Sequence, residues 1–321
     1  MTHNMDTTAV VLERPEHLVL SRLDLAAPQE GDIVVDIEWS GISTGTEKLL
    51  WSGRMPTFPG MGYPLVPGYE SVGRITEAGS QSGHRVGERV FVPGARCYGE
   101  VKGLFGGAAS RVVVPGQRAF TISDDLGERA VLLALAATAY HAVAGGGTRH
   151  PIVPPELIVG HGVMGRLLAR MTVLAEFPAP TVWETCPERA EGARGYPVVR
   201  PEDDPRRDYK SIYDVSGDAA ILDSLIARLA PGGEIVLAGF YSAPLSFNFP
   251  PAFMREAQIR AAAEWKPADM LAVREIAESG FLDLDGLITH REDASRAERA
   301  YRTAFGDTQC LKMVLDWRAT A

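Results

Sequence analysis

The stretch LIVGHGVMGRLLAR, residues 157–170, decides the fold of the second half of the chain. In it, Gly160, Gly162 and Gly165 have the spacing G-x-G-x-x-G between an apolar strand and a helical pattern. In such a unit the first glycine permits a tight turn and the second lets a pyrophosphate approach the backbone. The third lets the helix pack close to the sheet. The stretch therefore predicts a strand, a dinucleotide-binding loop and a helix.

The start of this helix supplies the groups that would bind phosphate. Its unpaired backbone N–H groups and the positive end of its dipole face the anion. We therefore assign His161, Val163 and Met164, together with the three glycines, to the nucleotide site. The glycines alone would also fit an ordinary strand-to-helix turn, so the assignment depends on the residues that follow.

An acidic residue follows at the distance that a dinucleotide site requires. The next predicted strand, TVWE, ends in Glu184, 24 residues after Gly160. An acid at this place binds the adenosine ribose hydroxyls and repels a 2′-phosphate, which favours NAD over NADP. Arg189, five residues later, is the counter-argument, because an arginine there could accept the phosphate.

The second half of the chain alternates apolar strands with connecting segments. This rhythm predicts an α/β architecture with a doubly wound parallel sheet, in which cofactors bind at the carboxyl edge of the strands. Helices are expected through GRLLARMTVLAE and AILDSLIARLA. The six strand candidates are ELIVG, PTVWE, YPVVRP, SIYDVSG, GEIVLAG and IRAAAEW.

The first 125 residues or so differ in pattern, with short alternating runs between Gly and Pro turns such as DIVVDIEWSG and ESVGRITEAG. Such runs predict an antiparallel β domain. After residue 280 a helix, ASRAERAYRTAF, and a strand, CLKMVLDW, are expected to return to this domain. We place the first domain at residues 1–127, completed by 281–321, and the nucleotide domain at 128–280.

Composition excludes several classes of protein. The net charge of −9 over 321 residues argues against a nucleic-acid partner. Three cysteines without paired spacing disfavour both a disulfide framework and a four-thiolate zinc site. The apolar stretch from Ala130 is too short to span a bilayer and reads as a buried helix. With no recognisable secretory signal, a cytoplasmic location is expected, and the sequence leaves contact with a membrane surface open.

Taken together, these segments resemble the medium-chain dehydrogenase/reductase superfamily over nearly the whole chain. The resemblance implies a GroES-like catalytic domain and a Rossmann domain that binds the nucleotide. SGISTGTEKLLWSG, PGYESVG and ALAATAYHA are similar to the segments that supply the three catalytic-zinc ligands in zinc-dependent members. Here Ser43, Tyr69 and Ala134 occupy those positions. Because neutral hydroxyl groups are poor zinc ligands and alanine is none, we expect no zinc.

Alcohol oxidation without a metal needs another way to hold the substrate oxygen. Our hypothesis is that Tyr69, with Ser43 or Thr44, makes hydrogen bonds to this oxygen, while Glu70 or Lys48 tunes or relays the proton. As a base, Tyr69 would need a nearby cation, and Lys48 is the nearest candidate in the sequence. Alternatively, Tyr69 is a packing residue that replaced an obsolete ligand.

The resemblance assigns further residues to the cofactor. Thr138 corresponds to the threonine behind the nicotinamide, and Glu70 to a residue of the active-site wall. Gly239 and Phe240 stand where the superfamily wraps the nicotinamide half of the cofactor, and Ser216 ends a strand at the binding edge. The edge strand IRAAAEW would pair two copies of the chain as a homodimer.

A narrower resemblance concerns the superfamily members that act on a bacteriochlorophyllide. It is carried by GISTGTEKLLWSGRMPTFPGMGYPLVPGYE, GLFGGAAS, DPRRDYKSIYDVSG, AAEWKPAD and GLITHR. It implies NAD-dependent oxidation of a hydroxyethyl side chain on this tetrapyrrole to an acetyl group. The residues expected to contact the pigment, unless they are structural and pack against the protein itself, are Trp51, Met55, Phe58, Met61 and His290.

Two other functions fit the same pattern. One is a zinc-free quinone or enoyl reductase of the superfamily, which would usually favour NADPH, and Glu184 opposes that cofactor. The other is a non-catalytic nucleotide-sensing protein that kept the sheet and lost the chemistry. Thr138, Glu70 and the polar loop GISTGTE argue against the second.

Overall fold

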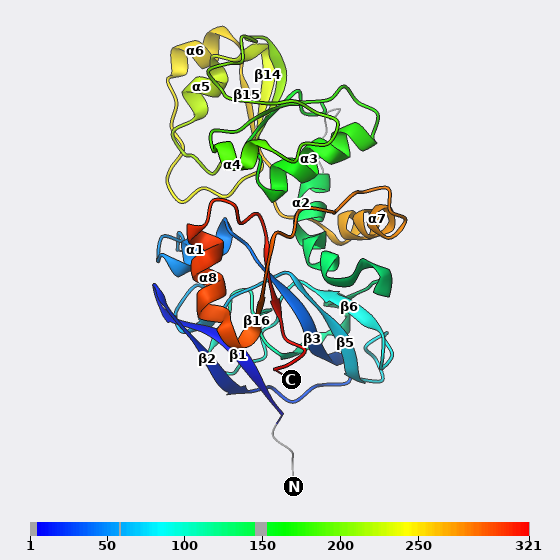
Figure 1. Cartoon of the computed structure of the whole chain (residues 1–321). Helices are drawn as coiled ribbons and strands as arrows, with labels where there is room; N and C mark the ends of the chain where they lie inside the picture. Colours follow the sequence, from blue (N-terminus) through cyan, green and yellow to red (C-terminus); the bar gives the residue numbers. More distant parts are fainter. Residues whose placement is uncertain (1–4, 58, 145–152, 321) are drawn as a thin grey trace. The chain divides into compact units, whose positions relative to one another are not determined.

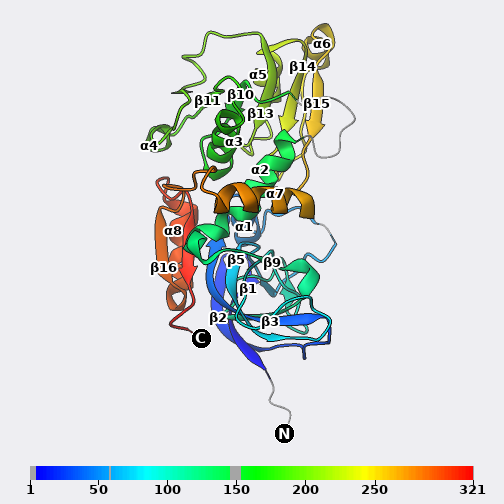
Figure 2. The ribbon, with the colours of Figure 1, turned by 90° about the vertical axis from the view of Figure 1, so that its right-hand side faces the viewer.

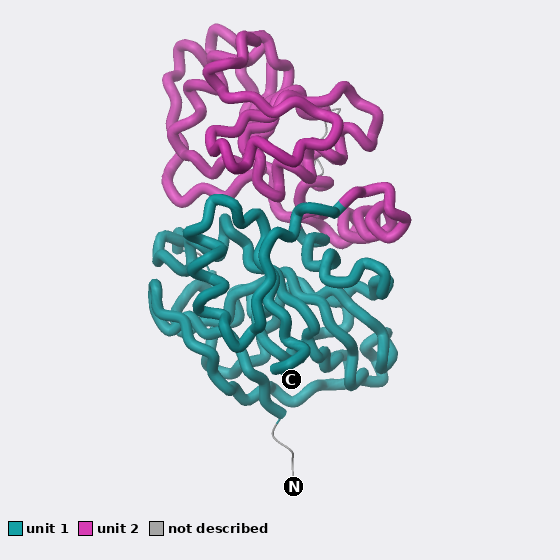
Figure 3. Tube along the Cα trace, viewed as in Figure 1, with its two compact units in different colours: residues 1–134, 284–321 teal, residues 135–283 magenta. Residues whose placement is uncertain are grey.

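The computed structural model describes residues 5–57, 59–144 and 153–320, which form two compact units. Unit 1 contains Met1–Ala134 and Leu284–Ala321, and unit 2 contains Leu135–Asp283, as Figure 3 shows by colour. The sequence predicts boundaries at 127/128 and 280/281, whereas the two units divide at 134/135 and 283/284. In the structure the first boundary falls inside the buried helix α2 (Leu133–Val143).

Unit 1 is built from two mainly antiparallel sheets. The larger has the strand order β16-β17-β3-β5-β6-β9, with β8 paired to β3, and the smaller has the order β2-β1-β4-β7. In Figure 1 most of their strands are blue to cyan, while β16 and β17 are orange to red. Their strands are β1 (Asp6–Arg14), β2 (His17–Asp24), β3 (Asp32–Ile42), β4 (Leu65–Val66), β5 (Ser71–Ala78), β6 (Arg89–Val92), β7 (Lys102–Gly103), β8 (Arg111–Pro115), β9 (Phe120–Thr121), β16 (His290–Asp293) and β17 (Met313–Asp316).

The end of the chain completes unit 1, as the sequence predicted. β17 pairs antiparallel with β3, with Met313 opposite Ile42. The helix α8 (Ala297–Gly306) lies beside β16, which Figure 2 shows from the side. Short helical turns occur at α1 (Thr46–Trp51), η1 (Gly116–Arg118), η2 (Asp124–Leu132) and η3 (Ala294–Arg296). β3 therefore pairs with β5 and β8 from the first half of the sequence and with β17 from its end.

Unit 2 contains the predicted doubly wound sheet. All six strand candidates form strands, and all neighbouring pairs are parallel, in the order β12-β11-β10-β13-β14-β15. β15 is at the edge of the sheet, as expected for IRAAAEW. The strands are β10 (Leu157–Val159), β11 (Thr181–Trp183), β12 (Val198–Val199), β13 (Tyr209–Asp214), β14 (Leu229–Leu237) and β15 (Gln258–Ala261).

The two faces of this sheet pack against different helices. Leu157 and Val159 belong to an apolar cluster with α5 (Leu222–Ile226), so Ile158 between them points to the other face. The predicted helix after the glycine loop is α3 (Val163–Leu174), which contacts β10. The remaining helices are α4 (Pro187–Ala190), α6 (Phe249–Met254) and α7 (Pro267–Glu278). None of the helices in the described ranges is long and apolar enough to cross a membrane.

One predicted helix is much shorter in the structure. The pattern AILDSLIARLA predicted a helix over the whole segment, but α5 stops at Ile226. The backbone of Leu229 instead pairs with Tyr209 in the parallel sheet. The apolar residues of this segment therefore belong first to a helix and then to a strand, and their helical spacing did not show where the helix ends.

Candidate active site and nucleotide site

The predicted catalytic residues Ser43 and Tyr69 meet in unit 1. Ser43 directly follows β3 and Tyr69 lies just before β5, and the adjacent ends of these strands are paired through Ser40 and Ser71. The Tyr69 hydroxyl donates a hydrogen bond of 2.6 Å to Ser43 Oγ. The tyrosine ring packs edge-on against Phe105, with 5.1 Å between the ring centres. Two segments that are far apart in sequence thus form one hydroxyl pair.

The surroundings of Tyr69 favour its neutral form. Burial raises the pKa of Tyr69 well above its usual value, and the nearby Glu70 carboxylate adds to this effect. The expected cation is not beside it, because Lys48 is exposed and its ammonium donates to the carbonyl oxygen of Phe305 at 2.8 Å. Thr44 is partly exposed. Tyr69 is therefore arranged as a hydrogen-bond donor and not as a base.

A fully buried carboxylate holds the loop that carries Ser43. Glu47, in α1, accepts a hydrogen bond from the Ser43 backbone N–H at 2.9 Å and one from the Tyr301 hydroxyl at 2.8 Å. Both donors are neutral, so their hydrogen bonds do not fully offset the hydration that the Glu47 carboxylate loses on burial. Burial raises the pKa of Glu47 to about 7. Tyr301, from α8, thereby connects the returning tail to the Ser43 loop.

A second buried carboxylate, Glu70, is paired with a lysine from the tail. Lys312 Nζ lies 2.8 Å and 2.6 Å from the two Glu70 oxygens, and neither side chain is more than 1% exposed. Burial raises the pKa of Glu70, while Lys312 acts in the opposite direction. A side chain at Gly41 would lie 2.2 Å from Glu70 Oε2, so the glycine makes room for this ion pair.

The residues at the three zinc-ligand positions do not fit a zinc ion. Ser43 and Tyr69 carry neutral hydroxyl groups that are hydrogen-bonded to each other, and Ala134 offers only a methyl group. Zinc in proteins takes thiolate, imidazole or carboxylate ligands. Within residues 5–57, 59–144 and 153–320 no cluster of three or more histidines, cysteines or acids is placed to hold a metal.

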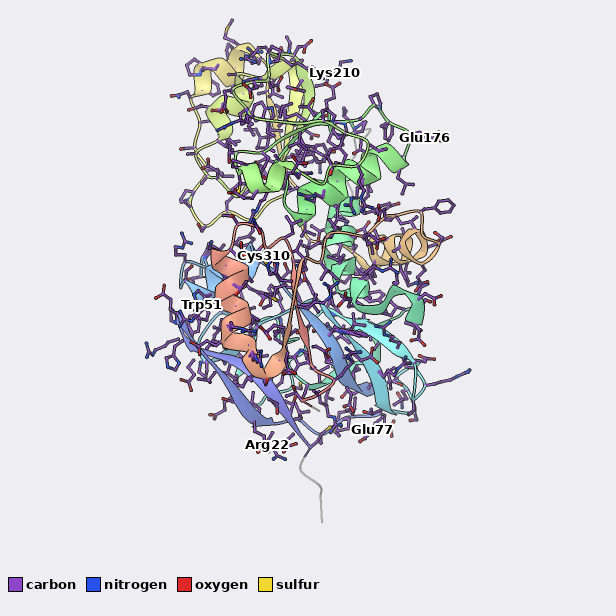
Figure 4. All side chains as sticks on the ribbon, in the orientation of Figure 1. Arg22, Trp51, Glu77, Glu176, Lys210 and Cys310 are labelled. Carbon is purple, nitrogen blue, oxygen red and sulfur yellow. The ribbon has the colours of Figure 1, made fainter. Side chains whose placement is uncertain are left out.

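The expected pigment-contact residues are divided between the core and the surface. Trp51 and Met55 belong to the apolar core of unit 1, with exposed fractions of 9% and 7%. Trp51, labelled in Figure 4, stacks on Tyr301 of α8. In the structure these two residues therefore pack against the protein itself, which was the alternative interpretation. Met61 and His290 are partly exposed, and Phe58 lies outside the described residues.

The glycine loop in unit 2 has the conformation that a dinucleotide requires. Gly160 has a φ of 105°, which favours glycine, and a Cβ atom on Gly165 would lie 1.9 Å from the Gly160 carbonyl oxygen. At Gly162 a Cβ atom would meet nothing within 4 Å, which leaves open space at the start of α3. Val163 and Met164 form the first turn of this helix. The loop therefore fits a pyrophosphate group.

The Glu184 carboxylate is fixed beside this loop by three backbone N–H groups. One carboxylate oxygen, Oε2, accepts from His161 at 3.0 Å, and the other accepts from Thr185 and Cys186 at 2.8 Å each. A carboxylate offers about four acceptor directions, so these bonds leave one of them open on Oε2. Glu184 is thus placed as a preorganised acceptor for a hydroxyl group at the carboxyl end of β11.

The other predicted cofactor residues of unit 2 surround Asp214, which ends β13. The Asp214 side chain accepts hydrogen bonds from the Ser216 N–H at 2.9 Å and the Tyr241 hydroxyl at 2.7 Å, and its carbonyl oxygen accepts from Gly239. A Cβ atom on either Gly160 or Gly239 would approach Val215 to 3.4 Å. The three turns therefore adjoin one another at one edge of the sheet. Phe240 is half exposed there.

One predicted cofactor residue is placed by a helix. Thr138 lies in α2 and is partly buried. It belongs to unit 2, like the glycine loop and the Asp214 turns.

The protonation of Glu47 should make stability depend on pH. With a folded-state pKa near 7 against 4.5 in the unfolded chain, the folded state holds a proton that the unfolded chain releases between these values. The free energy of unfolding therefore falls as pH rises through this window. We expect Glu47→Gln to remove about 3 kcal/mol or slightly more of that fall, since one pKa unit is worth about 1.4 kcal/mol. Urea unfolding at about pH 4 and pH 8 measures the fall in the free energy of unfolding between these pH values. An equal fall in the wild-type protein and in Glu47→Gln would contradict the prediction.

Sequence reasoning missed the buried network behind the Ser43–Tyr69 pair. Glu47, Tyr301 and Lys312 were not predicted, because their contacts join segments more than 200 residues apart. One signal was present in the sequence. Lys312 interrupts the apolar strand CLKMVLDW, and a lysine in a buried strand is expected to have a buried partner.

Comparisons with known proteins match this architecture. The family model for the alcohol dehydrogenase GroES-like domain matches residues 29–124. The 2-desacetyl-2-hydroxyethyl bacteriochlorophyllide A dehydrogenase of Cereibacter sphaeroides is 58% identical, over 99% of this chain and 100% of that protein. The protein of the same name from Rhodobacter capsulatus is 55% identical, over 98% of this chain and 99% of that protein.

Solved structures share the fold at low sequence identity. An alcohol dehydrogenase from Escherichia coli in complex with NADH matches with a TM-score of 0.79 and 23% identity, covering 97% of this chain and 99% of that one. A dehydrogenase from Sinorhizobium meliloti bound to NADP matches with a TM-score of 0.78, 19% identity and the same coverage. With a GroES-like domain, a six-stranded Rossmann sheet and full-length relatives at more than half identity, the chain belongs to the medium-chain dehydrogenase/reductase superfamily, in the family of the hydroxyethyl bacteriochlorophyllide dehydrogenases.

Proposed function

We propose that this chain oxidises the 3-(1-hydroxyethyl) group of bacteriochlorophyllide a to a 3-acetyl group in bacteriochlorophyll biosynthesis, with NAD as the oxidant and without a catalytic zinc. The observation that carries the substrate is the identity of 58% and 55%, over essentially the whole chain, with two dehydrogenases named for this compound. The glycine loop and Glu184 support the cofactor, and the Ser43–Tyr69 pair supports chemistry without zinc.

The reaction transfers two electrons and releases one proton. The carbinol carbon gives up a hydride, the hydroxyl group gives up its proton, and a carbon–oxygen double bond forms. When bound, the nicotinamide supplies the hydride acceptor. The protein has to hold the dinucleotide, orient the carbinol, and stabilise the negative charge that develops on its oxygen.

Tyr69 and Ser43 are the groups we propose for that oxygen. Because the pKa of Tyr69 is raised, its hydroxyl remains protonated, and we propose that in the pigment complex it donates to the developing oxyanion in place of Ser43 Oγ. The buried Glu47 and the Glu70–Lys312 pair hold the two strand ends that carry these hydroxyls. The conjugated macrocycle also spreads the partial positive charge at the carbinol carbon, which lowers the demand on the protein. Met61 and His290 are the partly exposed residues that we propose for pigment contact.

The proposed cofactor makes a prediction about Glu184. Glu184→Gln keeps the shape of the side chain but removes the negative charge that opposes a 2′-phosphate. We expect NADH to bind about tenfold more weakly and the preference for NADH over NADPH to shrink by at least that factor. Fluorescence titration with both nucleotides measures this. Glu191→Gln, an exposed acid of the same loop, is the matched control, and an unchanged preference in Glu184→Gln would refute the role of this acid.

The experiment that tests the function uses purified protein and 3-(1-hydroxyethyl) bacteriochlorophyllide a. With NAD, we expect NADH to form in step with the red shift of the pigment spectrum, and with NADP a much slower reaction. Reduction of a quinone or an enoyl compound by NADPH, with no oxidation of the pigment, would instead support the reductase alternative. Binding of NAD without any turnover would support a nucleotide-sensing role.

A further inference from the structure

The segment that follows Glu184 is held in an unusual way. Between β11 and β12, where every residue is described, the only helix is α4, of four residues, and none of its residues is buried. Apolar packing of α4 therefore cannot fix this segment against the sheet. The hydrogen bonds that do so come mainly from two buried polar side chains of the glycine loop and of α3, His161 and Arg166.

His161 is fully buried, and both of its ring nitrogens are bonded to this segment. Nδ1 lies 2.6 Å from the Arg189 carbonyl oxygen, and Nε2 lies 2.9 Å from the Tyr196 hydroxyl. A carbonyl oxygen can only accept, so Nδ1 carries the proton and Nε2 accepts from Tyr196. Burial lowers the pKa of His161 to about 4, which agrees with this neutral ring. The histidine of the glycine loop thus faces inward and binds the segment.

Arg166 makes a second connection from the first turns of α3. The residue is 4% exposed, and its guanidinium donates to the carbonyl oxygens of His161 at 3.0 Å, Arg189 at 3.1 Å and Glu191 at 2.7 Å. A Cβ atom on Gly192 would lie 2.4 Å from this guanidinium, so the chain passes directly over it. The Arg189 carbonyl oxygen therefore accepts from both His161 and Arg166.

The same loop residue also binds the acid at the other end of the segment. The backbone N–H of His161 donates to Glu184 Oε2 at 3.0 Å, while its ring holds Arg189. Glu184 is the residue that would accept the ribose hydroxyls, and Arg189 is the residue that could accept a 2′-phosphate. The backbone of His161 thus holds Glu184 at one end of the segment, and the side chains of His161 and Arg166 hold Arg189 further along it.

We propose that His161 and Arg166 form a clamp that fixes Glu184 and Arg189 in the arrangement that selects a free ribose 2′-hydroxyl over a 2′-phosphate. This inference rests on the proposed use of NAD. Both residues are positioning residues, because neither side chain is free to reach the nucleotide. If the clamp is released, the segment that joins Glu184 to Arg189 can move, so selectivity falls more than binding of the shared phosphates.

The test compares dissociation constants of NADH and NADPH, measured by fluorescence titration without pigment. Arg166→Met and His161→Ala are expected to weaken NADH binding about tenfold and leave NADPH binding nearly unchanged, which lowers the selectivity ratio about tenfold. His161→Asn, whose amide can replace the Nδ1–H donor, should recover most of the ratio. Tyr196→Phe removes the bond to Nε2 together with the contact of the hydroxyl with Arg170, and should lower the ratio about threefold.

Arg228→Met is the matched control for an arginine that holds backbone carbonyl groups. Arg228 also donates to three backbone carbonyl oxygens of unit 2, those of Pro201, Asp204 and Arg206. Arg228→Met should lower stability without changing the ratio of the NADH and NADPH dissociation constants. Wild-type selectivity in folded Arg166→Met and His161→Ala, or in Tyr196→Phe if those two do not fold, would overturn the clamp and leave NAD use intact. A wild-type protein that preferred NADPH would overturn the NAD assignment itself.

Discussion

Tyr69→Phe is expected to lower turnover about a hundredfold or more while the affinity for NAD stays at the wild-type value. Removal of one preorganised donor from a developing oxyanion typically costs about 100- to 1000-fold in rate. Tyr69 is held protonated by its raised pKa, and the proton that it donates to Ser43 at 2.6 Å is the one we propose it gives to the oxyanion when the pigment is bound. The nucleotide residues belong to unit 2, which this substitution does not touch. The measurement is kcat for pigment oxidation alongside a titration with NADH.

Tyr98→Phe is the matched control for this prediction. Tyr98 is another tyrosine of unit 1; it is buried, and its hydroxyl donates to the carbonyl oxygen of Gly106. Its loss should cost about 1 kcal/mol of stability and leave turnover unchanged. If Tyr69→Phe turned over at the wild-type rate, Tyr69 would have no part in the mechanism and would be a packing residue only.

The second large effect is expected for stability. Lys312→Met leaves the Glu70 carboxylate buried without its partner, and breaking a buried ion pair in this way costs about 3–5 kcal/mol. The cost should be greatest above neutral pH, because Glu70 can take up a proton in the variant at lower pH. Urea unfolding at about pH 8 gives the free energy of unfolding directly.

The double variant Lys312→Met/Glu70→Met separates the ion pair from the shape of the site. Replacement of both partners by apolar side chains of similar size is often neutral or stabilising, so most of the lost stability should return. If Lys312→Met lowered the free energy of unfolding by less than about 1 kcal/mol, the pair would contribute no more than an exposed surface pair.

Local patterns in the sequence predicted the nucleotide unit well. The glycine spacing, the alternation of six apolar strands with connections, and an acid at the end of the second strand all depend on neighbouring residues. The structure confirms the strands and the parallel sheet. The predicted length of the helix α5 was wrong, because the apolar residues around Leu229 fit a helix and a strand equally well.

The active-site surroundings could be predicted only in part. Ser43 and Tyr69 were proposed because their segments resemble those that supply zinc ligands in the superfamily, and the structure brings their hydroxyl groups together. The Glu70–Lys312 and Glu47–Tyr301 contacts depend on where the tail returns in space, which no local pattern fixes. Trp51 was expected at a pigment surface, but burial against Tyr301 and Phe305 removes its large apolar ring from water.

The central claim is that this protein oxidises the hydroxyethyl group with NAD at a site without zinc. The most direct measurement uses chelator-treated protein, shown by metal analysis to be free of zinc, with NAD and 3-(1-hydroxyethyl) bacteriochlorophyllide a, and follows NADH and the pigment spectrum together. We predict full turnover by the zinc-free protein. Turnover that appears only when zinc is restored would contradict the assignment of Ser43 and Tyr69.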